Sequence, residues 1–345
     1  MYRIASVTMC VIGLHAIALH AAADSKANKI KALDATNRVA RKDVLRRDVA
    51  DIASEDLFYG PGGAQLAPAS DTVFTFEKED LDGSNPKYVV RDNNGRKWKV
   101  KLGDEARPET VATRIVWAMG YFADEDYFLP SMRIQNFPLD VKRGRKELRP
   151  DGSFANVRIK FESKDRKKVA NWDWDNSPFT GTRELNGLRT LMAVINNWDL
   201  KTVNNAIFET KHAGEPLRIY EVSDLGASFG SPRFDLGYAH DKGDLEAYRK
   251  SKFIEAMHDS EVDFDIPGAP TKALIFKPGQ YGERRHLMSI GRHIPRDDAR
   301  WMGEQLGQLS AKQIEDAFRA GGYTEDEANQ FTTVIQQRVA QLKAL

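Results

Sequence analysis

Residues 196–207 read NNWDLKTVNNAI and place Asp199, Lys201 and Asn204 close together in the chain. The preceding segment, RELNGLRTLMAVINNW, is patterned as a helix with one buried face. A carboxylate, an ammonium group and an amide at this spacing can simply brace the turn after a helix, because Asp and Asn are common turn residues. They can also act chemically if other parts of the chain supply partners.

Two charged residues elsewhere are candidate partners. Asp224 lies downstream in the stretch YEVSDLG, and Lys101 lies upstream in the strand candidate RKWKVKLG. Lys97, Lys99 and Lys101 alternate along that strand and so share one face of it. Lys101 can therefore belong either to a solvated face or to a site formed with Asp224.

A glycine-containing turn and a helix flank the lysine strand. The turn LDGSNPK contains Gly83 and Ser84 and joins the strand candidates TVFTFEKED and KYVVRD. Pro108 can open a helix at its first turn, so we expect a helix that carries Glu109 near its start and ends at Gly120. Glu105 is a rival to Glu109 as the acidic partner of the lysine.

The order of elements predicts an α+β fold, with a strand-rich lobe followed by a helical lobe. Two capping-box patterns, S-x-x-Q at Ser310 and T-x-x-E at Thr324, start helices near the C-terminus. We expect four segments: a signal peptide at residues 1–23, a helical extension at 24–70, a strand-rich lobe at 71–170 and a helical lobe at 171–345.

The first residues predict export. A short positive start containing Arg3 is followed by an apolar run and by three alanines at residues 21–23, which resemble a secretory cleavage site. An N-terminal membrane anchor is the alternative interpretation of this run. Cleavage after Ala23 would remove Cys10, the single cysteine, and leave a periplasmic or secreted chain without disulfides. No later apolar run is long enough to span a bilayer.

The overall charge argues against a nucleic-acid partner. The 345 residues include 51 Lys plus Arg and 50 Asp plus Glu, which gives a net charge of +1. Proteins that bind nucleic acids usually carry a basic excess. The basic stretch VKRGRKELRPDG, residues 141–152, is a projecting loop that could also dock an acidic partner.

The polar residues fit the requirements of phosphoryl transfer from ATP. Such transfer needs a loop that approaches the phosphates, a lysine that neutralises them, oxygen ligands for Mg²⁺ and a carboxylate near the acceptor hydroxyl. Asp224 and Asn204 offer the hard oxygen atoms that Mg²⁺ prefers. Asp199 would then act as the base, with Lys201 beside it.

These motifs resemble those of the protein-kinase superfamily. DLKTVN, residues 199–204, is similar to the kinase catalytic loop, and SDLG is similar to its metal-binding motif. GSNPK, residues 83–87, resembles the glycine loop of HipA-like kinases, and DLGASFG, residues 224–230, resembles a stretch of secreted kinases of the secretory pathway. The resemblance covers roughly residues 72–230 and implies a two-lobed kinase-like fold.

The resemblance also implies a role for each residue of the set. Lys101 would be the phosphate-binding lysine, Glu109 its partner, and Gly83 with Ser84 part of the nucleotide loop. Asp199 and Lys201 would be catalytic, and Asn204 and Asp224 would hold the metal. The partners implied are ATP, Mg²⁺ and a protein or small-molecule hydroxyl that the sequence does not identify.

One departure supports a different class of function. Trp198 occupies the position where the superfamily usually has an arginine or a histidine before the catalytic aspartate. An exported chain also meets little ATP. The alternative is therefore a catalytically inactive pseudokinase, or a binding module of the cell envelope, that retains the fold.

Overall fold

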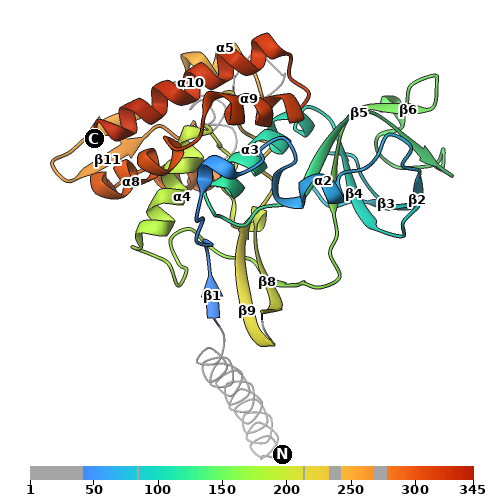
Figure 1. Ribbon diagram of the computed structural model, residues 1–345, viewed down its shortest axis with the longest axis horizontal. Helices are drawn as coiled ribbons and strands as arrows, with labels where there is room; N and C mark the ends of the chain where they lie inside the picture. Colours follow the sequence, from blue (N-terminus) through green and yellow to red (C-terminus); the bar gives the residue numbers. More distant parts are fainter. Residues whose placement is uncertain (1–41, 84, 213, 233–241, 268–277) are drawn as a thin grey trace, which may run out of the picture.

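The computed structural model describes residues 42–83, 85–212, 214–232, 242–267 and 278–345. Strands dominate the first part of the chain and helices the last part, and the two parts form neighbouring lobes (Figure 1). The prediction of a two-lobed α+β fold is confirmed. The predicted signal peptide lies outside the described residues.

A closed five-stranded barrel forms the strand-rich lobe, in the order β2-β3-β4-β6-β5. Side chains alternate along each strand, so every second one enters the barrel; Tyr88, Trp98, Val100 and Ile159 are among those fully buried there. The turn between β3 and β4 contains the pair Asn94-Gly95, which favours a hairpin, and Gly95 has φ 75°. The strands are β2 (Phe74–Asp80), β3 (Lys87–Asp92), β4 (Lys97–Leu102), β5 (Asp126–Gln135) and β6 (Ser153–Phe161).

Helix α3 (Ala106–Ala118) packs between the barrel and the helical lobe, against β5, β6 and α9 (Ala311–Ala320). It begins slightly before the predicted start, with Pro108 in its first turn. Gly120 follows the helix at φ 89°, and a Cβ there would lie 2.6 Å from the carbonyl oxygen of Arg47. Glycine is therefore required by both conformation and space.

A four-stranded sheet in the order β1-β9-β8-β7 follows the barrel. Its strands are β1 (Lys42–Val44), β7 (Lys167–Ala170), β8 (Asn205–His212) and β9 (Glu215–Val222). Helix α4 (Arg183–Val194) precedes β8 and is capped by the Thr182 hydroxyl. The antiparallel register pairs Asn205 with Val222. This hairpin therefore brings the residues before β8 next to the residues after β9.

The part of the chain after β9 contains five α-helices among its described residues, but it is not helical throughout. A small sheet of β10 (Ile254–Met257), β11 (Glu261–Phe264) and β12 (Ile294–Pro295) lies within it. Both predicted capping boxes are present, at Ser310 and Thr324. None of the helices in the described ranges is long and apolar enough to cross a membrane. The helices are α5 (Leu245–Lys250), α7 (Pro278–Ser289), α8 (Arg296–Leu306), α9 and α10 (Glu325–Lys343).

The prediction of a helical extension at residues 24–70 is wrong for its described part. From residue 42 the chain forms β1, the 3-10 turns η1 (Ile52–Ser54) and η2 (Gly60–Gly62), and the one-turn helix α2 (Gly63–Leu66). Residues 24–41 lie outside the described residues.

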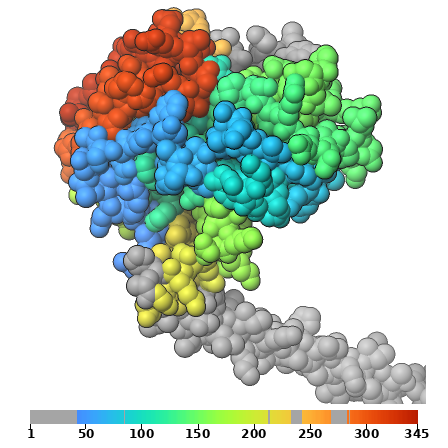
Figure 2. All heavy atoms as spheres, turned by 45° about the vertical axis from the view of Figure 1, so that its right-hand side comes forward, coloured from blue at the N-terminus to red at the C-terminus, as the bar shows by residue number. Residues whose placement is uncertain are grey.

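This N-terminal segment belongs to the main core. Leu45, Ile52 and Leu57 are at most 2% exposed and join the core cluster of α3, α4 and the C-terminal helices. Figure 2 shows the segment lying across the strand-rich and helical parts of the molecule. β1 pairs in parallel with β9, far along the chain. A local sequence pattern cannot reveal such a distant partner, and for that reason the helix prediction failed.

Candidate active site

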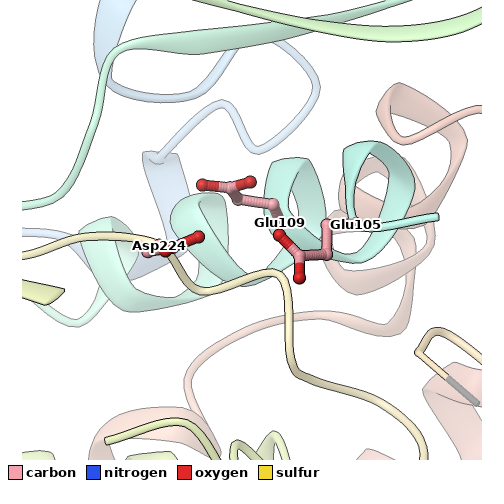
Figure 3. Close-up of side chains that lie close together, drawn as sticks. All are labelled: Glu105, Glu109 and Asp224. Atoms are coloured by element: carbon pink, nitrogen blue, oxygen red, sulfur yellow. The ribbon is translucent and has the colours of Figure 1, made fainter. Parts of the chain in front are cut away.

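Lys101 is the centre of a buried charge cluster. It lies at the end of β4, its side chain is only 4% exposed, and its Nζ is 2.9 Å from Glu109 Oε2 and 2.5 Å from Asp224 Oδ1. Its Nζ also pairs with Glu105. Figure 3 shows the three carboxylates converging from α3 and from the loop after β9. A buried ammonium group requires such partners, since an unpaired buried charge is strongly destabilising.

The carboxylates determine the protonation of Lys101. Burial alone would lower the pKa of Lys101, but the charges of Glu109, Asp224 and Glu105 outweigh it and raise the pKa above its ordinary value. Burial alone would raise the pKa of Asp224, but the charge and hydrogen bond of Lys101, together with the charges of Lys87 and Arg158, outweigh it and lower the pKa. The lysine is therefore a permanent cation, and Asp224 is ionised beside it.

Both candidate acids of α3 contact the lysine. Glu105 is the N-cap of the helix and Glu109 lies in its first turn, so the two residues are one turn apart on the same side. The second oxygen of Glu109 binds Arg158, with Nη2 to Oε1 at 2.9 Å. Burial raises the pKa of Glu109, against the attraction of Arg158 and Lys101. Glu105 and Glu109 are therefore joint partners of Lys101 rather than rivals.

Asp224 and Gly226 form a tight loop against α3. Asp224 has φ 56°, in the left-handed region that non-glycine residues rarely adopt. A Cβ at Gly226 would lie 2.5 Å from Glu105 Cβ, so only glycine lets the loop approach the helix this closely. The SDLG stretch is thus shaped by its contact with the acid-bearing start of α3.

The turn after α4 brings Asp199, Lys201 and Asn204 together. Lys201 Nζ lies 2.8 Å from Asp199 Oδ1. The Asn204 side-chain amide donates to the Asp199 backbone carbonyl at 2.7 Å and to its Oδ2 at 3.2 Å. The Asp199 N–H donates to Asn197 Oδ1 at 3.0 Å. The Asp199 carboxylate, which is 27% exposed, is thereby held in place from two sides.

The two acidic loops are bonded to each other along their length. Asn204, at the end of the 3-10 turn η4 (Thr202–Asn204), accepts two hydrogen bonds on its carbonyl oxygen from Ser223, from N–H at 3.0 Å and from Oγ at 2.8 Å. The Trp198 N–H donates to the Ala227 carbonyl at 3.2 Å. Asn197 Nδ2 donates to Ser228 Oγ at 3.0 Å. The loops carrying Asp199 and Asp224 therefore form one unit, as the β8–β9 register dictates.

A cavity of about 240 Å³, called here the inner cavity, adjoins this unit. Lys101, Glu109, Arg158, Asn204 and Asp224 line it. Asp199 is not among the lining residues and is connected to the cavity through its hydrogen bond with Asn204. A larger cavity of about 830 Å³ is lined by parts of β7, β8 and β9 and by Trp172. Neither Lys101 nor the two metal-ligand candidates line that larger cavity.

The glycine-containing turn is held by the basic loop at residues 141–152. The Arg143 guanidinium donates to the carbonyl oxygens of Gly83 and Asp80, both at 2.6 Å. Lys87, at the end of this turn, lines the inner cavity. It is the cross-strand partner of Lys101, which in turn pairs with Arg158 on the next strand. Ser84 lies outside the described residues. The basic loop, which contains the 3-10 turn η3 (Arg145–Glu147), therefore folds back on the molecule instead of projecting freely.

Sequence reasoning missed the second layer of charges. Arg158 binds Glu109, and it also binds Asp124 at 2.8 Å and Asp126 at 3.1 Å. Lys160 binds Asp124 at 3.0 Å. A signal was available in the strand NVRIKFES, because Arg158 and Lys160 alternate with apolar residues and so share the face opposite the barrel interior.

Comparison with known proteins gives matches only among solved structures. No family model and no curated protein matches the chain. The proinflammatory kinase CtkA of Helicobacter pylori is similar at 10% identity and a TM-score of 0.43, over 79% of this chain and 96% of the other. The Golgi casein kinase is similar at 9% identity and a TM-score of 0.35, over 79% and 72% of the two chains.

A second structure of the Golgi casein kinase, with Mn and ADP bound, is similar at 11% identity and a TM-score of 0.32, again over 79% and 72%. All three structures are of kinases, two of them of the same protein. Similarity at this level does not carry an activity from one chain to another, so the function must follow from the residues of this chain.

Proposed function

We propose that the chain transfers the γ-phosphoryl group of ATP, with Mg²⁺, to a hydroxyl group of a protein or small-molecule acceptor. The observation that carries this proposal is the buried Lys101, held by Glu109 and Asp224, beside Asn204 in one cavity. Phosphoryl transfer depends mainly on positioning and on charge stabilisation, and this cluster supplies both.

The donor set fits a divalent metal. Carboxylate oxygens of Glu105, Glu109 and Asp224 lie within 4.8 Å of one another around the Lys101 ammonium group, and Asp224 and Asn204 line the same cavity. Mg²⁺ is usually bound by one or two carboxylates together with phosphate oxygens and water. Asp224 and Asn204 would hold the ion. When bound, it would neutralise charge on the phosphates.

The remaining residues have separate roles. Lys101 would bind the phosphates, and Glu109 fixes the position of its ammonium group. Asp199 would accept the proton of the acceptor hydroxyl as the acceptor oxygen bonds to phosphorus and the bond to the leaving diphosphate breaks. The Lys201 ammonium group, 2.8 Å from Asp199 Oδ1, orients this carboxylate. Gly83 would belong to the nucleotide loop, which Arg143 holds in place.

Replacement of the two aspartates tests these roles separately. Asp199→Ala is expected to lower turnover by roughly 10²–10⁴-fold, the usual contribution of a general base, and to leave nucleotide affinity nearly unchanged. Asp224→Ala is expected to abolish metal-dependent nucleotide binding. Phosphate transfer assays and titration calorimetry on the mature chain measure both effects.

The matched control is Asp259→Ala, at an exposed aspartate in the turn between β10 and β11. It should change neither turnover nor affinity. Wild-type turnover in Asp199→Ala would reject the role of the base, and unchanged calorimetry in Asp224→Ala would reject the metal site.

One observation favours a non-catalytic alternative. The Asp224 carboxylate is already engaged by Lys101, and Trp198 precedes Asp199. A pseudokinase or envelope binding module could keep this closed arrangement as a structural unit. A melting-temperature screen of nucleotides with and without divalent metal separates the two functions. Nucleotide and metal together should raise the melting temperature of the enzyme, because it binds both, and should leave that of the binding module unchanged.

Export is part of the same proposal and rests on the sequence of residues 1–23 alone. N-terminal sequencing of the protein recovered from its native cell fractions tests it. A chain that begins after Ala23 in the periplasmic or extracellular fraction is the expected result, and an intact N-terminus in the membrane fraction would favour the anchor.

A further inference from the structure

A second cavity continues from the inner cavity and has a different charge. This outer cavity, of about 370 Å³, shares Lys99, Lys160, Lys168 and Ser223 with the inner one. It lies between the end of β6 and strand β7 on one side, and the start of β8 and the end of β9 on the other. A ligand bound at Lys101 that extends along the cleft therefore enters it.

The two cavities differ in their balance of charge. The inner cavity is lined by six basic and five acidic side chains. The outer cavity has only two acidic side chains, Glu162 and Glu221. Against them stand six basic ones: Lys97, Lys99, Lys160, Lys164, Arg166 and Lys168. The outer cavity therefore favours an anionic ligand even before any group is bound at the inner end.

The barrel register concentrates these cations. Lys99 on β4 and Lys160 on β6 are direct cross-strand partners, a placement that is unfavourable for like charges. Each is partly compensated, Lys99 by Glu162 at 3.2 Å and Lys160 by Asp124 at 3.0 Å. Lys168 on β7 faces them from across the cavity.

Lys168 differs from them because, within the described ranges, it forms no ion pair. Burial, followed by repulsion from Lys160 and Lys99, lowers the pKa of Lys168, and the attraction of Glu221 and Asp124 offsets this only in part. A neutral base placed in this cavity would remove the lysine from water without giving it a partner, which is costly. An anion would instead bond all three ammonium groups and relieve their repulsion.

We propose that the outer cavity binds a phosphate group, so that the ligand of the whole cleft carries phosphates at both ends. The phosphates at the inner end are those that the proposed function places at Lys101, and this part of the proposal rests on that function. Two sources have this chemistry: a nucleoside triphosphate with a further phosphate on its ribose, and a linear polyphosphate long enough to occupy both cavities. ATP itself would leave the outer cations without an anion.

Calorimetry on the mature chain at fixed ionic strength tests the proposal with three probes: ATP, ATP with a 3′-phosphate, and linear polyphosphate. One additional charge-assisted contact should tighten binding by about 10-fold relative to ATP. A gain with the phosphorylated nucleotide alone, or with polyphosphate alone, identifies the source. No gain with either probe overturns the proposal.

The matched variants are Lys168→Ala and Lys167→Ala. Lys167 is the adjacent residue of β7 and is exposed, as Lys168 is, but it lines neither the inner nor the outer cavity. The gain in affinity should disappear in Lys168→Ala and persist in Lys167→Ala, with similar melting temperatures for both. Equal behaviour of the two variants would contradict the assignment of Lys168.

Inorganic pyrophosphate separates this proposal from the proposed function. If pyrophosphate binding survives Lys101→Ala but is lost in Lys168→Ala, the outer phosphate site stands even where ATP fails to bind. If it is lost only in Lys101→Ala, phosphate binds solely at the inner end, and the outer site is rejected while the proposed function is retained.

Discussion

At the scale of the residue, the site consists of buried charged side chains that stabilise one another. Lys101, Arg158 and Glu109 lie almost entirely out of water, and each charge is stable only because its partners are present. Asp224 also holds an uncommon left-handed backbone conformation. Such strained, charged positions are frequent at functional sites.

Glu221 is a buried carboxyl group whose charge is expected to change near neutral pH. It is fully buried on β9, beside Arg166 and Asp124. Burial, and then the charge of Asp124, raises the pKa of Glu221 to about 7 from an ordinary 4.5. The folded protein therefore binds this proton more tightly than the unfolded chain does.

The expected consequence is a pH-dependent stability. The contribution of Glu221 should be fully present below pH 4.5 and lost as the pH rises through 7. At about 1.4 kcal/mol per pKa unit, the free energy of unfolding should fall by roughly 3 kcal/mol across this window. Chemical denaturation at a series of pH values, compared with Glu221→Gln, measures the difference.

Glu221→Gln should remove this slope because the amide does not titrate. Glu215→Gln, at an exposed position on the same strand, should keep it. If wild type and Glu221→Gln show the same slope between pH 4.5 and 7, Glu221 does not carry a raised pKa.

At the scale of the element, alternation and capping determine what forms. The strand KWKVKL places Trp98, Val100 and Leu102 in the barrel and its lysines on the face toward the cleft. That lysine face is not a uniform solvated surface, because α3 covers its end and buries Lys101 alone. The same period-two pattern thus yields two partly exposed lysines, Lys97 and Lys99, and a buried one, Lys101.

The capping box of α10 gives a prediction at this scale. The Thr324 hydroxyl accepts from the Glu327 N–H, and the Glu327 carboxylate accepts from the Thr324 N–H at 2.8 Å. Thr324→Ala should therefore lower the free energy of unfolding by about 1 kcal/mol, the usual value of such a cap. Urea denaturation measures it.

Thr333→Ala is the control, because Thr333 is an exposed threonine in the middle of the same helix. Its effect should stay within about 0.5 kcal/mol. Equal losses for the two threonines would mean that the cap contributes nothing beyond the threonine side chain itself.

At the scale of the whole molecule, the lobes share one apolar core. The main cluster includes α3 of the strand-rich lobe, the C-terminal helices and the N-terminal segment from Leu45 to Leu57. The barrel has its own smaller core. The N-terminal segment therefore contributes to the stability of the body and is not an independent arm.

Leu57→Ala tests this integration. Leu57 is 1% exposed, and truncation of a buried leucine costs about 2–5 kcal/mol. Its neighbour Phe58 is 40% exposed, so Phe58→Ala should cost much less. Melting curves of the two variants compare the adjacent positions. A Leu57→Ala variant as stable as wild type would show that the segment is not part of the cooperative core.

Local patterns determined much of this protein. The barrel strands, the turn at Gly95, the helix after Lys101 and both capping boxes follow from side-chain period and from residues with strong turn or cap preferences. The order of Lys101, Glu109, Asp199, Asn204 and Asp224 also suggested a common site before any contact was known.

Only the tertiary structure decided which charges meet. Glu105 and Glu109 both bind Lys101 because helix geometry puts them one turn apart beside the end of β4. Arg158 joins them because the barrel register sets it opposite Lys101. Strand β1 forms within the predicted helical extension because it pairs with strand β9. Each of these contacts joins segments that are distant in the sequence. A local pattern cannot predict them, because the stability of each contact depends on which distant segment lies opposite.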